Sequence, residues 1–163
     1  MKDFAVLRIK IANSESHSIE YKDTMREAET RFHNILAADE GSEATNYCLC
    51  MILDKHANVV RSEVHDYRAE PTAFYPVIRI FEKNEEMSNS VQIFDDNPAN
   101  PGKAHYDAVK RWYAIIAADL TDEAVTYNAA IMMDNSGMLG EHKAFERAVE
   151  PEPEPEPTPE PEE

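Results

Sequence analysis

The residues Ala28-Glu-Thr-Arg31-Phe-His-Asn-Ile35-Leu-Ala37-Ala38-Asp39 return as Ala108-Val-Lys-Arg111-Trp-Tyr-Ala-Ile115-Ile-Ala117-Ala118-Asp119. The likeness continues without a gap to Asp54 and Asp134, always at an offset of 80 residues. Ten of the 27 positions from 28 to 54 are identical to their partners. We infer that the chain contains an internal duplication, and the repeated stretch decides how each copy folds.

Apolar residues in this stretch recur at the spacing of a helix. They fall at i, i+4, i+7 and i+8, which predicts one face turned towards a core. In the first copy Thr24 and Glu27 form a capping-box pattern, so we expect the helix to begin there and to end before Gly41. The predicted core stripes are Ala28, Phe32, Ile35 and Leu36 in the first copy and Ala108, Trp112, Ile115 and Ile116 in the second.

Strand patterns surround both helices. Phe4–Ile11 alternates, with Arg8 and Lys10 on a face that we expect to be wet, and the apolar run 45–53 leads through a turn to a further strand. The remaining strands are predicted at 18–21, 59–67, 74–81, 91–94, 125–133 and 138–145. The second copy carries nine extra residues, which we assign to a longer polar turn at 82–90 and a Pro/Gly connection at 97–102.

These elements predict an α+β protein made of two tandem ββαββ repeats, at residues 1–70 and 71–148. Each repeat should form an antiparallel sheet covered by one helix, with the two related by pseudo-twofold symmetry. A single repeat of this size buries too little apolar surface to be secure alone. We therefore expect the two repeats, packed as one compact unit, or a dimer of the chain, to share a sheet or a core.

Residues 149–163 have a different composition, with glutamate and proline alternating over most of their length. Proline blocks helix and sheet, and repulsion between glutamates extends the chain, so we expect a polyproline II arm without a packed core. Two interpretations stay open. The arm is a solubilising spacer, or it is an acidic segment for a basic partner or part of a nucleic-acid mimic.

The balance of charges limits the classes of partner that we expect the chain to bind. Lys and Arg total 16 against 32 Asp and Glu, a formal net charge of −16. Direct binding to a phosphate backbone is disfavoured, because no cluster of basic residues stands out in the sequence. No apolar run has the length of a membrane span, and the first residues lack the apolar core of a signal peptide, so we expect a soluble cytoplasmic protein.

Asp39 and Asp119 are the candidate functional residues. A carboxylate near a helix C-terminus interacts unfavourably with the helix dipole. When both copies keep such a destabilising residue, it can mark a function. The structural alternative, which we favour, is that each aspartate leaves the helix and hydrogen-bonds the backbone of the following loop. Tyr47 and Tyr127, also retained, are interpreted as packing residues.

The cysteines, the histidines and the known sequence motifs predict no catalytic or metal-binding site. Cys48 and Cys50 lie two apart in an apolar strand, which favours buried reduced thiols over redox or metal chemistry. The six histidines show no metal-ligand spacing, and no motif for phosphate binding or nucleophilic catalysis is present. We assign no catalytic, cofactor-binding or metal-binding residue.

The pattern R-x-x-x-I-x-A-A-D-x-x-x-E-A-x-x-Y, followed by an apolar strand and an Asp-led turn, resembles small repeat-containing proteins encoded in phages and prophages of gut Firmicutes. The likeness covers about residues 4–69 and 74–148. That group has no assigned activity, so no functional residue is carried over. The resemblance implies a viral or prophage context, in the host cytoplasm or associated with the virion.

Three hypotheses for function follow. The leading one is a non-enzymatic module for protein interaction, self-association or assembly, because the chain is duplicated but has no catalytic motif. The second is an acidic host-directed inhibitor that mimics nucleic acid. The third is a small-ligand-binding protein, or an enzyme without a recognisable motif, with its site between the repeats.

Overall fold

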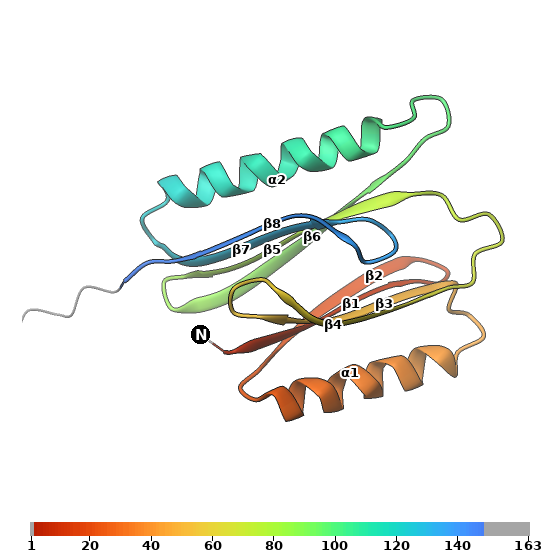
Figure 1. Cartoon of the computed structure of the whole chain (residues 1–163), viewed down its shortest axis with the longest axis horizontal. Coiled ribbons are helices and arrows are strands. Elements are labelled where there is room, and N and C mark those ends of the chain that lie inside the picture. The colour runs from red at the N-terminus through yellow and green to blue at the C-terminus, as the bar shows by residue number, and fades with distance from the viewer. Residues whose placement is uncertain (1, 149–163) are drawn as a thin grey trace, which may run out of the picture.

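The structure, a computed structural model, describes residues 2–148 and consists of two similar halves (Figure 1). The order of elements in each half is strand, strand, helix, strand, strand. The first half comprises β1 (Phe4–Ile11), β2 (Glu15–Lys22), α1 (Met25–Glu40), β3 (Tyr47–Asp54) and β4 (Val59–Asp66). The second half comprises β5 (Phe74–Lys83), β6 (Glu86–Asp95), α2 (Lys103–Thr121), β7 (Val125–Met133) and β8 (Leu139–Glu146).

Each half forms one antiparallel four-stranded sheet, as the sequence predicts. The strand orders are β2-β1-β3-β4 and β6-β5-β7-β8, so the most apolar strands are central and the polar strands lie at the edges. Neighbouring strands pair antiparallel throughout both sheets. The α+β class is confirmed.

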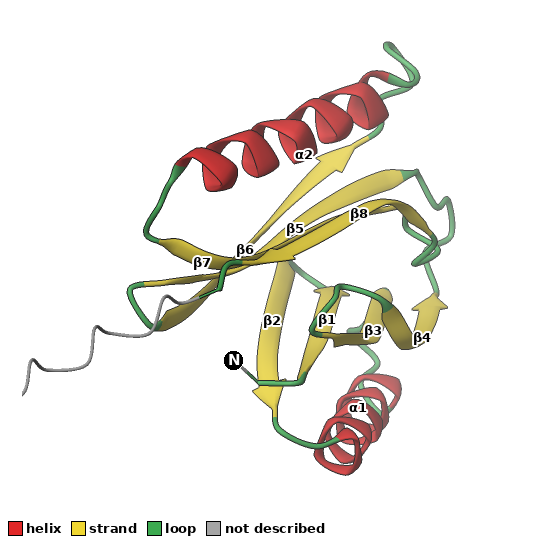
Figure 2. Cartoon of the chain, turned by 60° about the vertical axis from the view of Figure 1, so that its left-hand side comes forward, coloured by secondary structure: helices red, strands yellow, loops and turns green. Residues whose placement is uncertain are grey.

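The two sheets pack face to face, with one helix outside each (Figures 1 and 2). One core cluster spans both halves, since Leu7, Leu49 and Met51 belong to it together with Ile78 and Ile131. Two further clusters lie under the helices, one between α1 and its sheet and one between α2 and its sheet. The order of layers is therefore helix, sheet, sheet, helix.

The central strand β3 is apolar on both faces because both faces are covered. In β3, Leu49, Met51 and Leu53 face the partner sheet, while the alternate residues face α1. The predicted stripes of both helices are confirmed, and the buried residues of each helix include all four of its members. Thr24 and Glu27 form the predicted capping box, and α1 ends at Glu40, directly before Gly41.

The two halves also exchange reciprocal hydrogen bonds. The hydroxyl of Tyr47 donates to the backbone carbonyl oxygen of Asn135 at 2.8 Å. The hydroxyl of Tyr127 donates to the backbone carbonyl oxygen of Lys55, also at 2.8 Å. Donors and acceptors are both related by the 80-residue offset. Each tyrosine thus fixes the turn of the opposite half, which explains why both copies retain it.

The turns that accept these bonds have the same construction. Asp54 accepts backbone N–H bonds from His56 and Asn58, and Asp134 accepts the equivalent bonds in the second half. The fourth residue of each turn has a positive φ, 63° at Ala57 and 78° at Gly137. The retained aspartates therefore organise the turns that carry the acceptors.

Two expectations were wrong, and a third is not tested. Residues 82–90 do not form a long polar turn, because β5 and β6 extend to a tight turn at Asn84 and Glu85, both with positive φ. The face of β1 that carries Arg8 and Lys10 is not wet but lies beneath α1. The expected polyproline arm falls on residues 149–163, which lie outside the described residues.

The tyrosine pair gives a test of the contact between the halves. Tyr47→Phe and Tyr127→Phe each remove a hydroxyl from a buried ring, and each should lower the free energy of unfolding by about 1 kcal/mol. Urea denaturation measures the change. Tyr113→Phe is the matched control, because the Tyr113 ring is exposed and its hydroxyl has no hydrogen bond within residues 2–148. Equal effects of all three substitutions would contradict the reciprocal bonds.

Candidate functional site

Asp39 and Asp119 lie at equivalent places, each in the last turns of its helix and each facing its own sheet. Their exposed fractions are 3% and 2%, so both carboxylates are buried. Both continue the core stripe of the helix rather than leaving it, which corrects the expectation that they start the following loop. The helices lie on opposite sides of the molecule, so the two aspartates are not brought together (Figure 1).

Asp39 is held by three side chains from the sheet. Arg8 donates from Nε to one carboxylate oxygen at 2.8 Å and from a terminal nitrogen to the other at 2.5 Å, a bidentate pair. Lys10 donates to Asp39 at 2.9 Å, and the Cys48 thiol donates at 3.0 Å. Each carboxylate oxygen therefore accepts two bonds.

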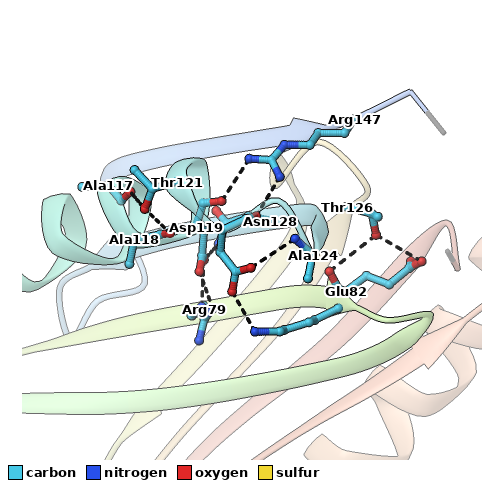
Figure 3. A network of polar contacts seen from close by, with 12 residues as sticks. Arg79, Glu82, Ala117, Ala118, Asp119, Thr121, Ala124, Thr126, Asn128 and Arg147 are labelled. Carbon is cyan, nitrogen blue, oxygen red and sulfur yellow. Dashed lines mark hydrogen bonds and ion pairs between the residues drawn. The ribbon is translucent and has the colours of Figure 1, made fainter. Parts of the chain in front are cut away.

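Asp119 keeps the arginine but changes the other partners (Figure 3). Arg79, from β5, is again bidentate, and Asn128 takes the place of Cys48. Phe81 takes the place that Lys10 has in the first half, because each comes two residues after the arginine. The Arg79 guanidinium lies 3.5 Å from the centre of the Phe81 ring. The Arg–Asp pair is thus the constant part of the site.

The electrostatics around Asp39 favour a structural role for this residue over a catalytic one. Burial would raise the pKa of Asp39, but the bonds from Arg8, Cys48 and Lys10 outweigh it and lower this pKa to about 2. Burial, together with the neighbouring Asp39 carboxylate, raises the pKa of Cys48 to about 12. At neutral pH Asp39 stays ionised and Cys48 stays a thiol, so neither is poised to transfer a proton or to attack a substrate.

The space around these residues is closed. The small cavity that Asp39 shares with Cys48, Thr45 and His65 has essentially no volume, about 0 Å³. A cavity of about 10 Å³ lies between the two halves, beside Tyr127 and Ala57, and is about the minimum that one water molecule requires. Within residues 2–148, neither place can hold a substrate.

One cluster has metal-ligating side chains, which the spacing of histidines did not predict. His65 lies 2.9 Å from Glu63 through Nε2 and 3.3 Å from Glu40 through Nδ1. Both ring nitrogens already face a carboxylate, so a metal ion would have to displace one of these contacts. The cluster joins β4 to the end of α1, and sequence spacing missed it because Glu40 comes from another element.

An open groove of about 490 Å³ lies beside the start of α1 and is lined by residues that include Lys2, Asp23, Arg26 and Arg31. Its charges largely pair among themselves, since Lys2 contacts Asp23 at 2.5 Å and Arg31 contacts Glu20 at 2.5 Å. Arg26 also lines the groove and forms no ion pair within residues 2–148, so one positive charge stays unpaired there.

The outer face of α2 is the most unusual exposed surface. Tyr106, Tyr113 and Leu120 have exposed fractions of 66%, 60% and 48% and follow one another at intervals of seven residues, so they lie on one side of the helix. We call this the α2 stripe. The seven-residue spacing of these three residues is visible in the sequence, but the core-facing stripe of the same helix is the periodicity on which the sequence prediction rests.

Comparisons with known proteins do not assign the chain. No family model, no curated protein and no solved structure matches it. Within the described residues, neither helix combines the length and the apolar character that crossing a membrane requires. Function must therefore be argued from the surface and its chemistry.

The buried ion pair gives a prediction with a defined pH dependence. Asp39→Asn should lower the free energy of unfolding at neutral pH by about 2–3 kcal/mol, because Arg8 and Lys10 lose their shared partner. The folded pKa of Asp39, about 2, lies below its ordinary value near 4. The contribution is therefore complete above pH of about 4 and is lost as the pH falls towards about 2.

Urea denaturation between these pH values measures both effects. The variant should lack the part of the acid destabilisation that comes from Asp39. Asp23→Asn is the control, because its ion pair with Lys2 is exposed and should contribute little. A variant as stable as the parent, with the same loss of stability in acid, would contradict the structural role.

Proposed function

We propose that the chain is a non-enzymatic protein-binding or assembly module whose docking surface is the outer face of α2. The observation that carries this proposal is the α2 stripe. Two tyrosines and a leucine are exposed on one side of the helix, and large exposed apolar side chains that share one side are of the kind that protein partners cover. From Tyr106 to Leu120 the stripe extends about 21 Å along the helix axis.

The first half of the chain supplies an internal comparison. The residues 80 positions before the stripe are Arg26, His33 and Glu40, so the same face of α1 is polar. The core-facing residues of the two helices remain apolar in both copies. Because the fold tolerates a polar outer face on α1, it does not require the aromatic face on α2, and a separate role explains that face better.

The charges around the stripe indicate the kind of partner. Lys110 falls between Tyr106 and Tyr113 on the same side of the helix, and Lys103 lies one turn before Tyr106, whereas Arg111 lies on another side. Within residues 2–148, Lys110 and Arg111 form no ion pair, whereas Lys103 pairs with Asp107. A basic and aromatic surface on a chain with a net charge of −16 favours a segment rich in carboxylates with flat apolar groups between them.

The alternatives have weaker support. A ligand or enzymatic site between the halves has only the cavity of about 10 Å³ available among the described residues. Mimicry of nucleic acid requires regular rows of acids, whereas the exposed face of α1 carries both signs, in Arg26, Glu29 and Glu40. The phage or prophage origin, with a role in the host cytoplasm or in the virion, stays part of the proposal as its expected context.

Site-specific photo-crosslinking tests the docking surface. A photoreactive phenylalanine analogue is placed at position 113 of the full chain, in the cells that produce it, and covalent adducts are identified by mass spectrometry. The matched control carries the same group at position 33, the equivalent place on α1. We expect adducts at position 113 that are absent at position 33 and are lost with Lys110→Glu.

The readout separates a docking face from an exposed aromatic residue. Adducts that form equally at positions 33 and 113, or that survive the charge reversal at Lys110, would contradict the proposal. The absence of any adduct at position 113 would also contradict it. Lys110 is exposed, so the substitution should leave the fold intact.

A further inference from the structure

The chain leaves its last strand beside the end of α2. Arg147, directly after β8, donates to the carbonyl oxygens of Leu120 and Asp122 at 2.7 Å and to that of Asp119 at 3.3 Å (Figure 3). The last turn of α2 contains no basic residue, so Arg147 supplies the positive charge that this helix end favours. Residues 149–163 therefore begin at the Leu120 end of the α2 stripe.

The composition of residues 149–163 complements that stripe. The segment carries seven glutamates and six prolines, and no lysine or arginine. Extended proline-rich segments dock on exposed aromatic side chains, because the proline rings are flat, apolar and already ordered. Glutamates between the prolines can pair with Lys110, and with Lys103 where they compete with Asp107.

The length of the segment also fits. At about 3.1 Å per residue, residues 149–163 span roughly 46 Å in an extended conformation, whereas the 19 residues of α2 span about 28 Å. The segment can therefore reach the other end of the helix. There the N-cap residue Gly102 provides no side-chain cap and the first turn has no acidic residue, in contrast to the capping box of α1. The Asp96 carboxylate accepts a hydrogen bond from the Gly102 N–H there at 3.2 Å, and the positive end of the helix dipole favours further carboxylates.

We propose that residues 149–163 lie along the outer face of α2 in the same chain, with prolines on Tyr106 and Tyr113 and glutamates beside Lys103 and Lys110. This inference rests on the proposed function, since it names a built-in occupant of the docking surface. The segment covers the α2 stripe, and an acidic partner has to displace it. The contact is intramolecular, so weak individual interactions suffice, because a short tether gives an effective concentration of order mM.

The repeat architecture supports this choice of occupant. Only α2 has the aromatic and basic face, and only the repeat that contains α2 is followed directly by the acidic segment. The residue equivalent to Arg147 in the first half is Tyr67, which leads instead into the connection to β5. The helix face and the segment that complements it therefore occur at the same end of the same repeat.

Paramagnetic relaxation enhancement in the full chain tests the proposal. Thr158→Cys provides a site for a nitroxide spin label, and Cys48 and Cys50 should stay unlabelled because both are buried and burial raises the pKa of each thiol to about 12. Amide signals are recorded for an isotope-labelled protein with the nitroxide oxidised and then reduced. We expect several-fold stronger broadening along 103–120 on α2 than along the equivalent α1 face.

Electrostatic and concentration controls make the result specific. The broadening on α2 should fall with Lys110→Glu and with an increase of salt from about 0.05 M to about 0.5 M, and it should not depend on protein concentration. Unchanged signals elsewhere show that the variant is folded. Equal broadening of α1 and α2, or broadening on α2 that ignores Lys110→Glu, would overturn the proposal.

A mixing experiment distinguishes binding within one chain from binding between chains. Spin-labelled chains without isotope are mixed with isotope-labelled chains without the spin label. Broadening on α2 in this mixture as strong as in the doubly labelled chain would overturn binding within the chain. If the segment makes no contact but position 113 still crosslinks to another protein, this inference fails and the proposed function stands, whereas the absence of both signals removes both.

Discussion

The face-to-face packing of the two sheets is the constraint on which the rest of the structure depends. Each sheet has an apolar face turned away from its helix, formed in the first half by Leu7, Leu49 and Met51 and in the second by Ile78 and Ile131. Neither helix can cover that face, because each already covers the opposite one. The two halves therefore shield each other from water, and the hydroxyls of Tyr47 and Tyr127 find their acceptors only across the interface.

Much of this architecture could be predicted from the sequence, because its signals are local. The core stripe from Ala28 to Leu36, the Thr24 capping box and the order of strands follow from spacing within a few residues. The bidentate contact of Arg8 with Asp39 joins residues 31 positions apart, so no local pattern showed it. A retained arginine on an otherwise apolar strand, Arg8 in one copy and Arg79 in the other, was the available clue, but we interpreted that face as wet.

The candidate site and the proposed surface show the opposite effects of duplication. Asp39 and Asp119 are retained because a buried carboxylate and its arginine must change together or lose stability. The outer faces of the helices have no such constraint, and there Arg26 and His33 on α1 correspond to Tyr106 and Tyr113 on α2. Retention between the copies thus marks the scaffold, whereas divergence at exposed positions marks the surface that we assign to binding. A search guided by identity alone selects the first and misses the second.

The central claim is that the halves share one core and unfold together, and Leu49→Ala tests it most directly. Leu49 is buried in the first half, and its Cδ1 lies 3.2 Å from the place that a Cβ at Gly137 of the second half would take. The single tryptophan, Trp112, lies in the second half beneath α2. We predict that the urea midpoint from Trp112 fluorescence falls together with that from circular dichroism, in one transition weakened by about 2–5 kcal/mol. Two transitions, with that of Trp112 unchanged, would contradict the account.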